Sequence, residues 1–363
     1  MLLHGKGREM TTRLIVCFDG TWNRPDNNPD LTARIETNVC RFYEAIPSGT
    51  PAGIDVQQKW YDSGVGTNWY DRMAGGTFGI GIDQKIREGY QWLADNYPNG
   101  DTSDVEVFIL GFSRGAYTAR SLVGMIRNCG LLLPENAHRV RDAYALYRQR
   151  DETPDTDQAQ IFRTRYSREI KIKFLGVWDT VGALGIPLQA LQWLNAKEYA
   201  FHDTELSGIV QNAAHALAID EFRVDYQATL WAPVIKPGQD VEQRWFSGAH
   251  ADVGGGYQSR LLSDISLAWM QRKAAAVGLA IDTPEIPAVA KENWMHSPTD
   301  SYQQFLDGAY AKTHPRFYRP MRIGSGLNEV VDESVVNRCR DNSGYRPLNP
   351  GFPAPLIYPK SGS

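Results

Sequence analysis

A strand followed at once by a Gly-x-Ser-x-Gly turn and a helix is the feature that most constrains this chain. Residues 105–110, Val-Glu-Val-Phe-Ile-Leu, are typical of a buried strand. Gly111, Ser113 and Gly115 form the motif, and apolar residues at helical spacing follow it as far as Gly130. Glycines on both sides of a serine remove the Cβ atoms that would clash in a sharp strand-to-helix turn. The pattern predicts Ser113 as a nucleophile; the alternative is an incidental serine in a tight turn.

Composition narrows the class of protein. The 363 residues suffice for one large α/β domain with insertions or for two average domains. The net charge is −4 and the pI is near 6.0, whereas nucleic-acid-binding proteins are normally basic, so we expect no nucleic acid partner. The four cysteines show no C-x-x-C pairing, which predicts buried free thiols. No apolar run has transmembrane length and no secretory signal is visible, so a cytoplasmic location is expected.

The expected organisation is one catalytic domain with additions. We predict a disordered leader over residues 1–12, an α/β-hydrolase catalytic domain over 13–282, and an irregular C-terminal layer packed on the same domain over 283–363. The sheet is expected to be doubly wound and mostly parallel, with helical or loop insertions over its catalytic edge. Residues 183–206 are rich in apolar side chains and predict a cap over an acyl-binding pocket, or else a core helix. The glycine-rich stretch 61–81 predicts the edge of a mobile lid rather than a nucleotide-binding loop.

Two more residues lie at or just past the ends of predicted strands. Asp179 follows the strand predicted over 170–178, and His250 follows the one predicted over 242–246. Open α/β sheets place their sites at the carboxyl ends of the strands, and the order Ser…Asp…His is that of α/β hydrolases. We therefore predict Asp179 as the acid and His250 as the base of a catalytic triad with Ser113. The alternatives are a helix N-cap for the aspartate and a turn histidine bonded to local backbone.

The first predicted strand ends in Asp19-Gly20-Thr21. Phosphatases of the haloacid dehalogenase type carry D-x-D-x-T at such a place, but the position of their nucleophile is Cys17 here. In an α/β hydrolase, an early loop gives the oxyanion hole a second backbone N–H, beside that of the residue after the nucleophile, here Arg114. We expect Gly20 or Thr21 to supply it, with Asp19 ordering the loop. A turn with no catalytic part is the alternative.

Asp252 competes with Asp179 for the role of triad acid. It lies two residues after His250, and this short link makes it hard for its carboxylate to reach Nδ1 while Nε2 faces the serine. We therefore expect Asp252 to play a supporting part. Asp252 with Asp19 makes only a weak metal pattern, so no metal and no cofactor is expected.

The remaining expected elements follow from periodicity. Strands are expected over 14–18 and 57–61, and helices over 32–46, 83–97, 134–150, 207–222 and 264–277. His215, inside the helix expected over 207–222, is interpreted as structural.

Five stretches together resemble a known family. They are Phe18–Asn23, Tyr61–Thr67, Gly111–Arg120, Trp178–Gly182 and the loop around His250. They resemble the DUF2235 family, which includes the catalytic domain of the Tle1-type phospholipase effectors of type VI secretion in bacteria. The resemblance covers residues 13–277. It implies an α/β-hydrolase fold, a triad at the three matching positions, phospholipase A activity, transient contact with a membrane surface, and export through that secretion system.

The chemistry expected from these residues is ester hydrolysis. The predicted function is a serine hydrolase that cleaves carboxylic esters, with phospholipid or other lipid acyl esters as candidate substrates, through an acyl-enzyme. Two alternatives stay open. An acyltransferase would use the same triad with an alcohol in place of water, and a binding module would keep the fold without catalysis.

Overall fold

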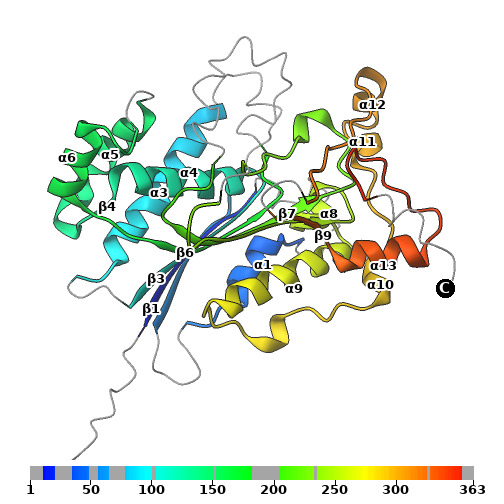
Figure 1. Ribbon diagram of the computed structural model, residues 1–363, viewed down its shortest axis with the longest axis horizontal. Coiled ribbons are helices and arrows are strands. Elements are labelled where there is room, and N and C mark those ends of the chain that lie inside the picture. Colours follow the sequence, from blue (N-terminus) through cyan, green and yellow to red (C-terminus); the bar gives the residue numbers. More distant parts are fainter. Residues whose placement is uncertain are drawn as a thin grey trace, which may run out of the picture.

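The structure is a computed structural model that describes residues 11–20, 35–48, 56–64, 78–99, 104–149, 153–181, 205–232, 235–324 and 328–353. In this part of the chain a seven-stranded sheet forms the centre of the molecule, in the order β2-β1-β3-β6-β7-β8-β9 (Figure 1). All neighbouring strands in it pair in parallel. The strands are β1 Thr12–Phe18, β2 Val56–Asp62, β3 Val105–Phe112, β6 Ile172–Trp178, β7 Val210–Ala218, β8 Asp240–Phe246 and β9 Glu329–Val331.

Helices cover both faces of the sheet, so the fold is α/β as predicted (Figure 1). One face carries α3 Phe78–Asn96, α4 Arg114–Cys129, α5 Val140–Arg148 and α6 Asp157–Tyr166. The other carries α1 Asn38–Glu44, α9 Leu261–Ala276 and α10 Lys291–Met295. A two-stranded antiparallel pair, β4 Leu131–Leu132 with β5 Ser167–Arg168, lies beside the first group.

The central strands β1, β3 and β6 are largely apolar on both faces, because both faces of the sheet are covered by helices. In β1, Leu14 and Val16 enter the core under α3 and α4, whereas Ile15 and Cys17 enter the core under α1 and α9. This alternation follows from the two-residue period of a strand. Since β1 pairs with β2 on one side and β3 on the other, the winding of the chain reverses there. Doubly wound sheets hold their ligands at such a reversal, outside the carboxyl ends of the strands.

The helix predicted over 207–222 is wrong, because these residues form strand β7. Its sequence, Val-Gln-Asn-Ala-Ala-His-Ala-Leu-Ala, is rich in alanine, the best helix former. The segment nevertheless forms a strand because it lies between β6 and β8. There, backbone pairing on both sides and burial on both faces outweigh its local helix propensity. His215 is fully buried in this strand, where it accepts a hydrogen bond from the Thr180 N–H.

Other helix boundaries shift as well. The helix predicted over 134–150 is a 3₁₀ turn, η1 Pro134–Arg139, followed by α5. Helix α1 begins later than predicted, at Asn38, because the Thr37 side chain caps it by accepting from the Cys40 N–H.

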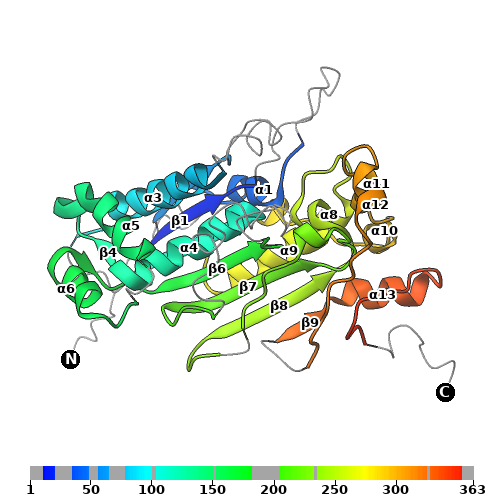
Figure 2. The same ribbon diagram turned by 90° about the horizontal axis from the view of Figure 1, so that it is seen from above.

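Residues 283–353 contain elements that their weak periodicity did not predict. They include β9, which pairs with β8, and the helices α11 Ser301–Gln304, α12 Ala309–Thr313 and α13 Glu333–Asp341. Figure 2 shows β6, β7, β8 and β9 side by side, with α13 next to β9. Met321, Val335 and Phe352 form a small core with Leu217 and Trp245 of the sheet. This region therefore packs directly on the edge of the sheet.

Several predictions fall on residues that the structure leaves undescribed. They are the leader up to residue 10, most of the glycine-rich lid edge (65–77), most of the cap segment (182–204) and Thr21. Among the described helices, none combines the length and the apolar character that a membrane crossing requires.

Candidate active site

Ser113 occupies the turn between β3 and α4. Its backbone is left-handed, with φ 57° and ψ −120°, a conformation that non-glycine residues rarely adopt. The flanking glycines permit this turn: a Cβ on Gly111 would lie 2.4 Å from the Gly115 carbonyl oxygen, and one on Gly115 would lie 2.2 Å from that of Phe18. The Ser113 N–H donates to the carbonyl of Trp178 at the end of β6, 3.0 Å away. Stored backbone strain of this kind is typical of a functional position.

Asp179 follows β6 immediately and is also strained, with φ 38°. Its N–H donates to the carbonyl of Ala216 at 2.8 Å, and its Oδ1 accepts from the N–H of Ala218 at 3.1 Å. Its side chain is fully buried. The aspartate is thus held by strand β7, on the side away from Ser113.

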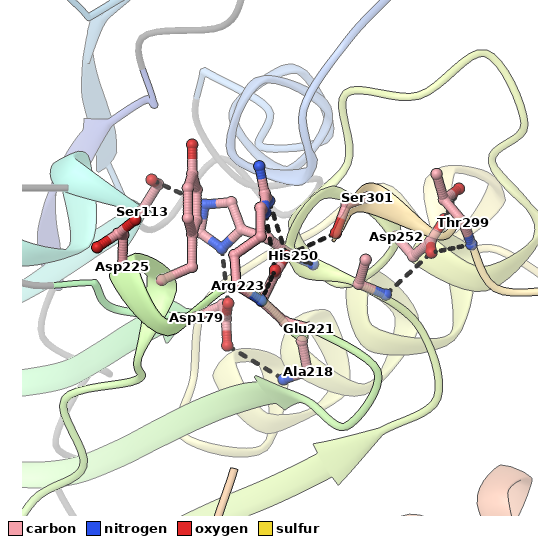
Figure 3. A network of polar contacts seen from close by, with 12 residues as sticks. Ser113, Asp179, Ala218, Glu221, Arg223, Asp225, His250, Asp252, Thr299 and Ser301 are labelled. Carbon is pink, nitrogen blue, oxygen red and sulfur yellow. Dashed lines mark hydrogen bonds and ion pairs between the residues drawn. The ribbon is translucent and has the colours of Figure 1, made fainter. Parts of the chain in front are cut away.

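His250 begins the short helix α8 His250–Gly254, which follows β8. Its Nε2 lies 2.8 Å from Ser113 Oγ and its Nδ1 lies 2.6 Å from Asp179 Oδ2 (Figure 3). The ring packs against the Phe112 ring at a centroid distance of 4.7 Å and meets the edge of Tyr226 at 5.2 Å. The imidazole therefore bridges the hydroxyl and the carboxylate, and its plane is fixed by aromatic neighbours.

A second buried carboxylate holds the start of α8. Glu221 accepts from the His250 N–H at 3.2 Å and from the Ser301 hydroxyl at 3.1 Å (Figure 3). It also forms an ion pair with Arg223 at 2.7 Å. Burial acts to raise the pKa of Glu221, but the Arg223 guanidinium holds it below its ordinary value. Glu221 therefore keeps its charge while it positions the histidine.

Asp252 lies away from the imidazole nitrogens. Its Oδ2 accepts from the N–H groups of Ala249 and Thr299, at 2.9 and 2.8 Å, and its Oδ1 accepts from the Thr299 hydroxyl at 3.0 Å. Burial raises its pKa. In this position Asp252 closes the first turn of α8 and ties it to the C-terminal region (Figure 3).

Asp19 and Gly20 lie at the end of β1, beside the serine. A Cβ on Gly20 would lie 3.5 Å from Ser113 Cβ. The Gly20 N–H, however, donates to Asp19 Oδ1 at 2.6 Å, so it can serve an oxyanion only if that bond opens. Asp19 Oδ2 accepts from Thr37 at 2.6 Å and from the Tyr61 hydroxyl. Burial raises the pKa of Asp19 to about 6, against the effect of these donors.

Asp19 and Asp252 do not share a ligand cluster. Within the described ranges, the group of three potential metal ligands that lie close together is Glu36, Cys40 and Glu44 near helix α1, and it includes neither aspartate.

The sequence reasoning missed the groups that surround the acid and the base. Arg319 forms a two-pronged ion pair with Asp179, and Glu221, Thr299 and Ser301 hold the histidine helix. The Glu-Phe-Arg stretch after β7 carries charges next to a strand end, a signal that the helix prediction concealed. Arg319 lies in a region without periodicity, and no local pattern marks it.

Known proteins similar to this chain include the following three. The uncharacterized protein YEL023C of Saccharomyces cerevisiae is 28% identical over 245 residues, which are 61% of this chain and 33% of that protein. A second similar chain comes from the structure of the Tle1 effector bound to the VgrG spike of the type 6 secretion system. Its sequence is 20% identical to this one and its TM-score is 0.43; the match covers 69% of this chain and 52% of that one. An uncharacterized protein from Pseudomonas aeruginosa is 18% identical with a TM-score of 0.45, covering 85% and 51% of the two chains. This chain thus spans about half or less of the length of these relatives.

A family model also matches the chain. The model of the catalytic domain of Tle1-like type VI secretion phospholipase effectors matches residues 12–273. The match begins with β1, includes Ser113, Asp179 and His250, and ends within α9. Because it covers well over half of the chain, this protein belongs to the family of Tle1-like phospholipase effector catalytic domains.

Proposed function

We propose that this chain is a serine hydrolase of carboxylic esters and that lipid acyl esters are its class of substrate. The observation that carries the proposal is the hydrogen-bonded series from Ser113 through His250 to Asp179, built at the ends of three parallel strands. The strained turn at the serine adds support. Membership of a phospholipase effector family supports lipid esters, and it supports export by type VI secretion as the route of the protein out of the cell.

The geometry suits acyl transfer through an acyl-enzyme. His250 Nε2 accepts the Ser113 proton as Oγ attacks the acyl carbon, while Asp179 keeps the proton on Nδ1 and stabilises the imidazolium. The Arg114 N–H, the first of α4, is the proposed donor to the oxyanion. His250 then returns the proton to the leaving alcohol. Water attacks the acyl-enzyme in the same way and releases the acid.

Labelling with a fluorophosphonate tests the proposal. We expect the purified protein to form a single adduct, which peptide mass spectrometry maps to Ser113, and to hydrolyse p-nitrophenyl esters and phospholipids. Adding an acceptor alcohol separates hydrolysis from acyl transfer, because a transferase would form the new ester in preference to the free acid. A protein that takes up no label and cleaves none of these esters would be a binding module, contrary to the proposal.

Hydrolysis is expected to survive chelation. The base in the proposed mechanism is His250, and the carboxylates of Asp19 and Asp252 are occupied by hydrogen-bond donors of the protein. We expect the rate of p-nitrophenyl ester hydrolysis to be unchanged after dialysis against EDTA. Loss of activity with EDTA, and its return with a divalent ion, would instead indicate a metal-dependent hydrolase.

A further inference from the structure

Arg319 binds the carboxylate of Asp179 through both of its Nη nitrogens. Nη1 lies 2.6 Å from Asp179 Oδ1 and Nη2 lies 3.0 Å from Oδ2. The same two nitrogens donate to the carbonyls of Ala218, at 2.9 Å, and Tyr226. The side chain of Arg319 is 1% exposed. A planar guanidinium in two-pronged contact fixes the orientation of a carboxylate as well as neutralising it.

This arginine comes from outside the part of the chain that the family model matches. The match ends at residue 273, whereas Arg319 belongs to the region between α12 and β9. Its carbonyl accepts from the side-chain amide of Asn349 at 3.1 Å, and Met321, two residues further on, enters the small core at the sheet edge. The C-terminal region therefore contributes the Arg319 guanidinium, which contacts the Asp179 carboxylate directly.

Arg319 is the cation that touches Asp179 within the described part of the chain, and the other charges around His250 have other partners. Glu221 is paired with Arg223, and Asp252 accepts from Thr299. Of the other titratable groups on neighbouring elements, Tyr226 packs against the ring, Asp220 accepts from the Gly248 N–H two residues before His250, and His215 in β7 accepts from the Thr180 N–H. Burial lowers the pKa of His215 to about 3, so this second histidine is neutral.

We propose that Arg319 is a positioning residue for ester hydrolysis, which holds the Asp179 carboxylate toward His250 and lets His250 act as a base at lower pH. The inference rests on the proposed function and adds the C-terminal region to its machinery. A carboxylate alone beside an imidazole stabilises the protonated ring, which cannot accept the serine proton. A guanidinium on the far side of that carboxylate offsets part of its charge, so the neutral ring is favoured.

The electrostatics of the acid agree with this role. Burial would raise the pKa of Asp179, but the Arg319 guanidinium and the hydrogen bond from His250 hold it well below its usual range. The acid therefore stays charged and bonded to the ring, with the Arg319 guanidinium in direct contact with it.

The test is the pH profile of kcat/KM on p-nitrophenyl acetate for the wild type, Arg319→Gln and Arg319→Lys. An adjacent charge typically changes a titration by about 1–3 pH units, so the acid limb of Arg319→Gln should move to higher pH by about one unit or more. Arg319→Lys keeps the positive charge but loses the bidentate contact of the guanidinium. The acid limb of its pH profile should therefore stay close to that of the wild type while kcat falls. Arg338→Gln is the matched control, because Arg338 is equally buried in the C-terminal region but donates to the carbonyls of Trp294 and His296.

The outcomes separate the inference from the proposed function. The control should lose melting temperature without any shift of its acid limb. An active wild type with an unshifted Arg319→Gln would overturn the role of Arg319 and leave the triad in place. If Arg319→Gln does not fold, Arg319→Lys decides: a lower kcat at an unchanged melting temperature supports the inference, and an unchanged kcat overturns it. A wild type that neither takes up the fluorophosphonate nor hydrolyses esters would overturn the proposed function and this inference together.

Discussion

Replacing Ser113 with alanine is expected to abolish ester hydrolysis while the fold survives. Removing the nucleophile of a serine protease costs on the order of 10⁶ in kcat, because the histidine and the acid then have no hydroxyl to activate. The side chain of Ser113 accepts no capping hydrogen bond from the first N–H groups of α4. Alanine carries the same Cβ as serine, so it adds no new steric strain at φ 57°. The measurements are kcat on p-nitrophenyl butyrate, fluorophosphonate uptake and the thermal melting curve.

Ser121 provides the matched control. It is a buried serine of α4, the helix that follows Ser113, about two turns beyond it. Ser121→Ala should keep the label and most of the activity, and it should lose at most a modest amount of stability with its hydroxyl. If Ser113→Ala takes up the fluorophosphonate as fast as the wild type, the nucleophile lies elsewhere and the proposed mechanism fails.

The parts of the site that were predictable are those at or just past the end of a strand. Ser113, Asp179 and His250 each follow an apolar run, and parallel strands bring their carboxyl ends to one edge of a sheet. Sequence order and strand ends were therefore enough to expect the three side chains to meet. Their catalytic roles are the proposal that the kinetic experiments test.

The parts that were not predictable depend on contacts between distant segments. Strand β7 has a helix-forming composition, and only its place between two other strands makes it a strand. Arg319 reaches Asp179 from 140 positions away along the chain. Long-range pairing leaves no periodic trace, so a single sequence does not reveal it.

The competition between Asp179 and Asp252 predicts the second large effect. Asp179→Asn should lower kcat on a short-chain ester by several orders of magnitude, since loss of the orienting acid costs on the order of 10⁴ in a serine protease. An amide can donate to Nδ1 and thereby favour the tautomer in which Nε2 carries the proton, so the imidazole cannot accept from Ser113. The substitution also leaves Arg319 without its counter-charge, and breaking a buried ion pair costs about 3–5 kcal/mol of stability. A melting curve must accompany the kinetics, because only a folded variant reports on the tautomer.

Asp252→Asn is expected to behave differently, although it lies on the same short helix as His250. Its carboxylate accepts from Ala249 and Thr299, and an asparagine oxygen retains part of this acceptor capacity. Loss of a cap of this kind costs about 0.5–2 kcal/mol, so the melting temperature should fall while kcat changes far less than in Asp179→Asn. Measuring kcat for both purified variants, with circular dichroism to confirm folding, decides the assignment. If Asp252→Asn loses nearly all activity while Asp179→Asn keeps most of it, the triad acid is Asp252. That result would also remove the reason for assigning Arg319 a role in ester hydrolysis.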